Sequence, residues 1–188
     1  KEPAPHVNCT TTPMETLTDA VRMAFEAAAP ERVTASWGHS SGINIAGIDP
    51  KTGEQYVTMI LASIISGAGA TQQMDGWHAC GPLSCFGALS SGDIELLEYQ
   101  YPILIHKYGL AEDSGGAGEY RGGCGTVWEV EPLGHEMTVV AFGEGREHPT
   151  MGAAGAEQIS PELKLGRLEI IHQDGVTDLY KQNTVTEI

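Results

Sequence analysis

The first regular pattern along the chain is a helical one. Apolar residues recur at every third or fourth position near the beginning of the sequence, at Met14, Leu17, Val21, Phe25 and Ala28. The helix is expected to begin at Thr12-Pro13, where a capping threonine precedes a proline in the first turn, and to end before Pro30. The apolar stripe predicts a helix that packs against the core of the domain.

An alternating pattern, which is typical of strands, follows the helix. Ile43 and Ile45 alternate with small or polar neighbours, and residues 56–65 are rich in β-branched and aliphatic side chains. Between them, residues 49–53 read DPKTG, in which the proline presets φ and the glycine closes a turn. We therefore expect a β-hairpin.

Residues 94–110 are predicted to form one strand or a strand with a bend, with Pro102 at an edge or a bulge in its middle. In a regular strand, Glu95 and Glu98 fall on opposite faces because their spacing is odd. One of the two carboxylates should then point inward, where it needs a hydrogen-bond donor. Arg121 is the expected donor.

Two more pairs of strands are indicated in the second half of the chain. Residues 126–131 and 138–142 are expected to pair antiparallel through a turn at 132–134, and residues 165–171 and 176–181 form a last hairpin. The predicted fold is therefore α+β. One main N-terminal helix lies on a mixed, mostly antiparallel sheet, with long glycine-rich loops at one end.

The most unusual stretch reads DSGGAGEYRGG, residues 113–123, in which five of the eleven residues are glycine. Glycine is kept at this density where the backbone needs a positive φ or passes very close to another segment. Two interpretations are open: Arg121 returns to Asp113 or a carbonyl group and fastens a turn, or the loop presents N–H groups and the guanidinium to an anion. We expect Arg121 to pair with a carboxylate of Asp113, Glu95 or Glu98.

A second long irregular stretch, residues 66–92, contains the candidate catalytic residues Asp75 and His78. Because sites form on loops that a scaffold positions, we expect residues 67–78 and 113–123 to approach each other at one end of the sheet. Asp75, His78 and Arg121 would then line the same cleft or interface. His78 is the expected proton carrier, and Asp75 is expected to orient a donor. The loop residues expected to face a ligand or a subunit interface are Gly67, Gly69, Asp113, Ser114, Gly115, Gly116 and Gly118. The alternative is that both loops are only structural.

Composition and charge exclude several classes of function. With 25 acidic and 10 basic residues the formal net charge is −15, so nucleic-acid binding is not expected. No apolar run reaches the ~18 residues that span a bilayer. The four cysteines form no CxxC pair and match no zinc spacing, and no phosphate-loop, nucleophile-elbow or HExxH motif is present. We expect a cytoplasmic protein with mostly buried, reduced cysteines and no metal site; a disulfide pair is the alternative.

The glycine run also carries a resemblance to a known family. Residues 95–103 read ELLEYQYPI and lead into DSGGAGEYRGG at 113–123, and this order of motifs resembles the hydantoinase B/oxoprolinase family. Two further matches support it: SGAGA at residues 66–70, followed by Asp75-Gly76, and PERV at residues 30–33. The motif of eleven residues makes this a specific signal.

The resemblance, which runs roughly from residue 8 to residue 155, implies a function. Members of this family are B-type subunits that act with an ATP-binding, hydantoinase A-type partner subunit. They hydrolyse cyclic amides such as hydantoin, N-methylhydantoin or oxoproline by phosphorylating a carbonyl oxygen. ATP and Mg are then expected on the partner, and no cofactor within this chain. Because the family's subunits are longer, residues 1–188 are expected to be a single domain or a fragment of a larger hydantoinase B-type subunit, the remainder of which is a partner as well.

Two alternatives remain open at this point. The sequence reads Gly92-Asp93-Ile94-Glu95 at a position where many hydantoin hydrolases of the family that it resembles have Thr-Pro-aliphatic-Glu. A related ATP-dependent ketone carboxylase of the acetone or acetophenone type is therefore one alternative. A non-catalytic scaffold segment of such a complex is the other alternative. In each case we expect the isolated chain to be neither stable nor active as a monomer, because long loops of this kind expose surface meant for partners.

Overall fold

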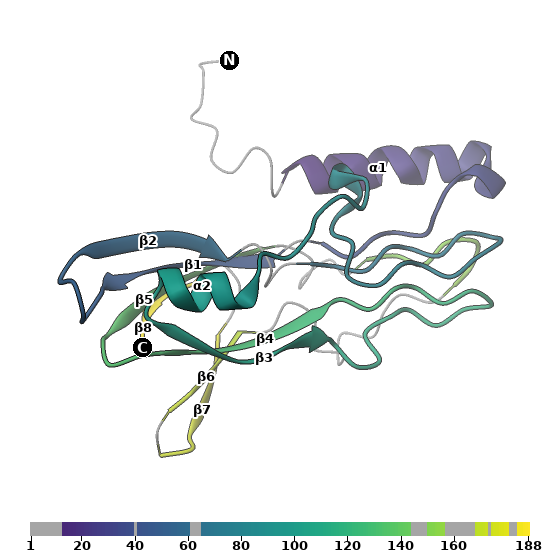
Figure 1. Cartoon of the computed structure of the whole chain (residues 1–188). Coiled ribbons are helices and arrows are strands. Elements are labelled where there is room, and N and C mark those ends of the chain that lie inside the picture. The colour runs from purple at the N-terminus through teal and green to yellow at the C-terminus, as the bar shows by residue number, and fades with distance from the viewer. Residues whose placement is uncertain are drawn as a thin grey trace, which may run out of the picture.

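The computed structural model of the chain describes residues 13–39, 41–60, 65–143, 150–156, 168–172, 174–180 and 184–188. Its helical elements are α1 (Pro13–Ala28), the short 3-10 turns η1 (Pro30–Arg32) and η3 (Leu83–Cys85), and α2 (Ile94–Gln100). Its strands are β1 (Ser41–Ile48), β2 (Gln55–Ile60), β3 (Ile103–Leu110), β4 (Thr126–Pro132), β5 (Met137–Gly143), β6 (Leu168–Ile171), β7 (Thr177–Tyr180) and β8 (Thr184–Glu187). The predicted α+β class is confirmed (Figure 1).

The strands form three antiparallel sheets in the described part of the chain, with the orders β2-β1-β5-β8, β3-β4 and β6-β7. The predicted hairpins β1–β2 and β6–β7 are confirmed. The predicted pairing of β4 with β5 is wrong, because β4 pairs with β3 while β5 lies between β1 and β8. No residue of β5 is exposed, so this strand needs neighbours on both edges, and a turn partner alone does not supply them.

The hydrophobic core lies between the four-stranded sheet and the β3–β4 pair. It consists of the buried side chains of Ile45, Ile60, Ile103, Met137 and Val139. Because Ile103 belongs to β3 and the other four belong to β1, β2 and β5, this core joins the two sheets.

The turn between β1 and β2 has the structure that its sequence predicts. The Asp49 carboxylate accepts hydrogen bonds from the backbone N–H of Lys51 at 2.8 Å and from the hydroxyl of Thr52 at 3.2 Å. Gly53 has a φ of +73°, a conformation that costs least for glycine.

The prediction of one strand over residues 94–110 is wrong in its first half, which forms helix α2. Asp93 caps this helix, since its carboxylate accepts the N–H of Leu96 at 2.9 Å. Glu95 is therefore an exposed helix residue, and Glu98 accepts the N–H of Ile105 at 2.7 Å, where the register of β3 and β4 shifts. Neither carboxylate is paired with Arg121.

Helix α1 is present as predicted, but the prediction of its inward face is wrong. The apolar residues of the predicted stripe are exposed: Leu17 by 57% and Phe25 by 61%. The inward face is polar instead, and Glu15 and Arg22 are each only 6% exposed. The inward face is selected by an ion network, described below, because a buried guanidinium needs its partners close by.

Candidate functional site

The two glycine-rich stretches meet at one end of the sheets, below α1 (Figure 1). The backbone N–H of Gly123 donates to the carbonyl of Ala68, and the N–H of Gly76 donates to the carbonyl of Arg121, both at 2.8 Å. The N–H of Ala35 donates to the carbonyl of Ala70 at 2.7 Å and adds a third segment. We call residues 35–38, 65–81 and 113–125 together the glycine layer.

Five glycines of this layer are required by close approach of backbones, namely Gly67, Gly69, Gly76, Gly115 and Gly123. A Cβ on Gly67 would lie 2.0 Å from the carbonyl oxygen of Gly123, and a Cβ on Gly123 would lie 2.0 Å from that of Trp77. Real Cβ atoms do not approach backbone oxygens so closely, so larger residues do not fit. None of the glycines in residues 113–123 has a positive φ; in this run only Asp113 has one, at +54°.

Asp75 and His78 fasten the second stretch to the first. The Asp75 carboxylate accepts the backbone N–H of Arg121 at 2.7 Å, and Nδ1 of His78 accepts the N–H of Cys124 at 2.8 Å. Since Nδ1 is an acceptor, the proton of the neutral ring is on Nε2. Both side chains belong to exposed residues, and both hydrogen bonds join segments that are 46 positions apart.

Arg121 pairs with the Asp113 carboxylate, as predicted. The side chains are 53% and 75% exposed, respectively, so this ion pair lies in solvent. Ser114 supports the same turn, because its hydroxyl donates to the carbonyl of Ala111 at 2.8 Å and accepts the N–H of Gly125 at 3.0 Å. Of the two interpretations of the glycine run, these contacts agree with the one in which Arg121 pairs with Asp113 and fastens a turn.

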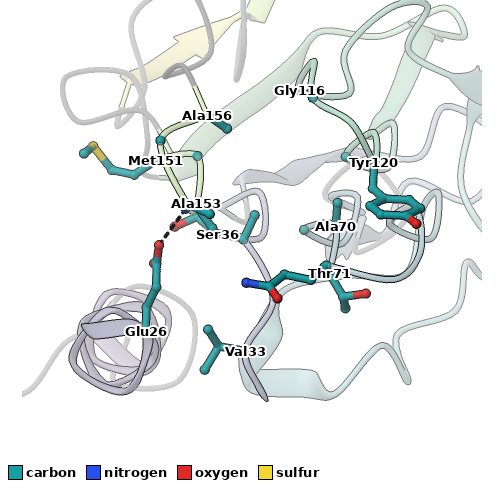
Figure 2. A pocket seen from close by; sticks show the side chains of 18 of the residues that line it. Glu26, Val33, Ser36, Ala70, Thr71, Gly116, Tyr120, Met151, Ala153 and Ala156 are labelled. Carbon is teal, nitrogen blue, oxygen red and sulfur yellow. Dashed lines mark hydrogen bonds between the residues drawn. The ribbon is translucent and has the colours of Figure 1, made fainter. Parts of the chain in front are cut away.

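A cavity of about 540 Å³ opens between α1 and the glycine layer. Its walls come from residues 26–36, 69–72, 116–122 and 150–156 (Figure 2). Gly69, Gly116 and Gly118 line it, whereas Asp75, His78 and Arg121 do not. The structure therefore brings the three candidate catalytic residues together but outside this cavity.

The cavity wall is held by an ion network that the sequence analysis missed. The Arg22 guanidinium donates to Asp19 and Glu26 at 2.7 Å each, and to the carbonyl of Thr34 and the hydroxyl of Ser36 at 3.0 Å each. Burial alone would lower the pKa of Arg22, but the hydrogen bonds and charges of Asp19 and Glu26 raise it on balance, so the guanidinium stays charged. The available signal was Asp19, Arg22 and Glu26 at i, i+3 and i+7 on one helix face.

The same network reaches the wall segment 150–156. The second oxygen of Glu26 accepts the backbone N–H of Ala154 at 3.0 Å. Figure 2 shows Glu26 and Ala153 on the same side of the cavity, opposite Gly116 and Tyr120. Among the described residues that line the cavity, Glu26 and Glu119 carry charge and none is lysine or arginine. The cavity therefore suits a neutral ligand or neutral protein atoms better than an anion.

Other features of the described residues bear on chemistry as well. No helix among them is long and apolar enough to cross a membrane. In residues 13–39, 41–60, 65–143 and the shorter described segments, no three His, Cys, Asp or Glu side chains gather as a metal site would require. Cys80, Cys85 and Cys124 are free thiols, and burial raises the pKa of Cys80; Cys9 lies outside the described residues.

Comparison with known proteins yields a consistent set of matches. The family model for hydantoinase B/oxoprolinase matches residues 1–187. The chain is 72% identical over 186 residues to the caprolactamase subunit beta of Pseudomonas jessenii. The matching region covers 98% of this chain and 32% of that protein. This chain thus spans about a third of the length of that relative.

Two solved structures also match the fold. The crystal structure of the ATP-dependent caprolactamase from Pseudomonas jessenii matches with a TM-score of 0.85 at 60% identity, over 100% of this chain and 32% of that one. The nucleotide-free structure of an acetone carboxylase matches with a TM-score of 0.55 at 25% identity, over 67% of this chain and 16% of that one.

Proposed function

Because this chain belongs to the hydantoinase B/oxoprolinase family, we propose that it is a segment of the B-type subunit of an ATP-dependent hydrolase that opens cyclic amides. The observation that carries the proposal is the 72% identity, over nearly the whole chain, to a caprolactamase subunit beta. We propose lactams, in which the amide is part of a ring, as the substrate class.

The lining of the cavity supports a division of labour between subunits. A nucleoside triphosphate is bound by basic side chains and by N–H groups at helix N-termini. In the part of the cavity wall that the structure describes, no residue is basic and two are acidic. The described part of the cavity lining therefore offers ATP no cation, and we propose that ATP and Mg are bound by a hydantoinase A-type partner subunit.

We propose distinct roles for the three candidate residues. Asp75 positions the glycine run, since its carboxylate holds the backbone of Arg121. Arg121 keeps the run closed through Asp113. His78 uses Nδ1 to hold Cys124, which leaves Nε2 as the nitrogen that can exchange a proton with a substrate or with the partner subunit.

The proposed activity is tested with the complete complex of A-type and B-type subunits. Caprolactam and smaller lactams should stimulate ADP release and yield the ring-opened amino acid. Each subunit assayed alone serves as the control and should be inactive. Turnover of acetone with bicarbonate, but not of any cyclic amide, would overturn the proposal in favour of a ketone carboxylase. That alternative has the weaker support of a match at 25% identity over 67% of this chain.

A purely structural role for the loops is the other alternative, and a specific observation favours it: Asp75 and His78 both hold backbone amides. His78→Asn separates the two roles, because its Oδ1 takes the place of Nδ1 while the side chain cannot transfer a proton near neutral pH. If His78 carries a proton, His78→Asn lowers kcat by about 100-fold or more with unchanged thermal stability. If His78 only positions the loop, His78→Asn remains active and His78→Ala loses both stability and activity.

A further inference from the structure

The outward surface of α1 is apolar and uncharged. Four residues on it are exposed by 45%, 57%, 47% and 61%, namely Met14, Leu17, Val21 and Phe25, which we call the α1 stripe. All charged residues of the helix point the other way: Glu15, Asp19, Arg22 and Glu26 are buried or half-buried. This is the reverse of the usual arrangement for a surface helix.

The helix cannot turn over to bury the stripe within this chain. Arg22 is held by Asp19 and Glu26 from α1 itself, by the carbonyl of Thr34, and by Ser36 of the glycine layer. Glu26 is also tied to Ala154. Rotating α1 would keep the contacts within the helix but break those to Thr34, Ser36 and Ala154. The polar groups of these three residues would then face the apolar stripe without partners, which is unfavourable. The stripe is therefore fixed on the outside of the described structure.

A neighbouring turn adds to the apolar surface next to this helix. The turn η3 packs against α1 (Figure 1), and the residue that follows it, Phe86, is 87% exposed. Phe86 also has a φ of +52°, a conformation that is uncommon for a bulky residue. An unfavourable backbone conformation that holds a large apolar side chain in solvent is typical of a functional surface. We therefore expect another protein surface to contact Phe86.

We propose that the α1 stripe is an interface inside the B-type subunit, covered by an apolar surface of the part of the polypeptide that this sequence does not include. This rests on the proposed function, in which the chain is a segment of a longer subunit. The caprolactamase subunit beta has most of its length outside the region that matches this chain. Permanent contacts of this kind are apolar and poor in charge, as the stripe is, whereas separable subunits meet through more polar surfaces.

The test measures the accessibility of single cysteines in the complete B-type subunit. Val21→Cys reports on the stripe, and Ala27→Cys, an exposed position on the flank of the same helix, is the matched control. Labelling with N-ethylmaleimide is followed by peptide mass spectrometry, and each rate is divided by the rate for the same subunit unfolded in urea. Cysteine at 21 should react at least about tenfold more slowly than cysteine at 27. Leu17→Cys is a second reporter if Val21→Cys does not fold.

Three results would overturn the proposal. Equal labelling at both positions, with and without the A-type subunit, would show that the stripe stays in solvent. Protection that appears only after the A-type subunit is added would assign the stripe to the partner subunit. Protection that depends on the concentration of the B-type subunit would assign it to a second copy of the same chain. The measurement needs no turnover, so protection in a complex that hydrolyses no lactam would refute the proposed activity and leave the interface standing.

Discussion

In the core between the sheets, large side chains fill the space between backbones, whereas in the glycine layer the backbones themselves touch. Ile45 and Met137 are 0% exposed and are held by the burial of apolar surface. Gly67 and Gly123 have no side chain, and the carbonyl oxygen of Gly123 lies only 2.0 Å from where a Cβ of Gly67 would be. The first region tolerates changes of shape that preserve volume, but the second has no room for an added atom at Gly67 or Gly123, and it is the second that borders the cavity.

The largest effect is expected from Gly67→Ala. The new Cβ meets backbone atoms of Gly123 at 2.0 and 2.3 Å, and neither segment can move without breaking hydrogen bonds of the layer. The substitution should lower the free energy of unfolding of the complete B-type subunit by more than about 4 kcal/mol, or prevent folding. Urea unfolding measures it. Gly92→Ala is the matched control, because nothing lies within 4 Å of its Cβ, and this variant should be nearly neutral. Equal stability of the two variants would show that the layer is loosely packed.

Arg22→Met should have the next largest effect. It removes a cation whose side chain is 4% exposed and leaves Asp19 and Glu26 without their shared partner. We expect a loss of about 3–5 kcal/mol, since breaking a buried pair strands the remaining charges. Arg32→Met is the control: its side chain is 83% exposed, and the change should cost less than about 0.5 kcal/mol. Thermal unfolding of both variants compares them directly, and a small effect at Arg22 would mean that solvent reaches the network.

In the hydrophobic core, Ile45→Val should cost only about 0.5–1.5 kcal/mol, because it removes one methylene group from a side chain that is 0% exposed. The comparison with Gly67→Ala is direct, because each change alters a buried residue by a single carbon atom. The midpoint of urea unfolding gives the difference. A larger loss for Ile45→Val than for Gly67→Ala would reverse the contrast between the two regions.

The smallest effect is expected at the exposed ion pair. Arg121→Ala removes a contact between side chains that are 53% and 75% exposed, so the loss should stay below about 1 kcal/mol. A double-mutant cycle with Asp113→Asn isolates the pair, since asparagine tolerates the positive φ at this position. A coupling energy well above 1 kcal/mol would contradict a purely solvent-exposed pair and would bring Arg121 closer to the tightly held part of the layer.

Local chemistry along the sequence was sufficient to predict several elements. The DPKTG turn, the hairpin around it and the last hairpin followed from residues that are close in the chain. The glycine run indicated close approach or positive φ, and the pair of Arg121 with Asp113 was among the expected contacts. The helix over residues 94–100 was missed because Asp93 was not recognised as its cap, although the cap and Glu95 in the first turn were visible in the sequence.

Contacts between distant segments decided the rest. Which face of α1 points inward was fixed by Thr34, Ser36 and Ala154, whose backbone and hydroxyl groups complete the network around Arg22 and Glu26; a helical pattern alone cannot show them. The sequence determined that this helix has an apolar face and a charged face. Only the tertiary structure decided that the charged face is the buried one. The four hydrogen-bond partners of the Arg22 guanidinium offset the free energy of its desolvation, whereas burial of a guanidinium without partners would be strongly unfavourable.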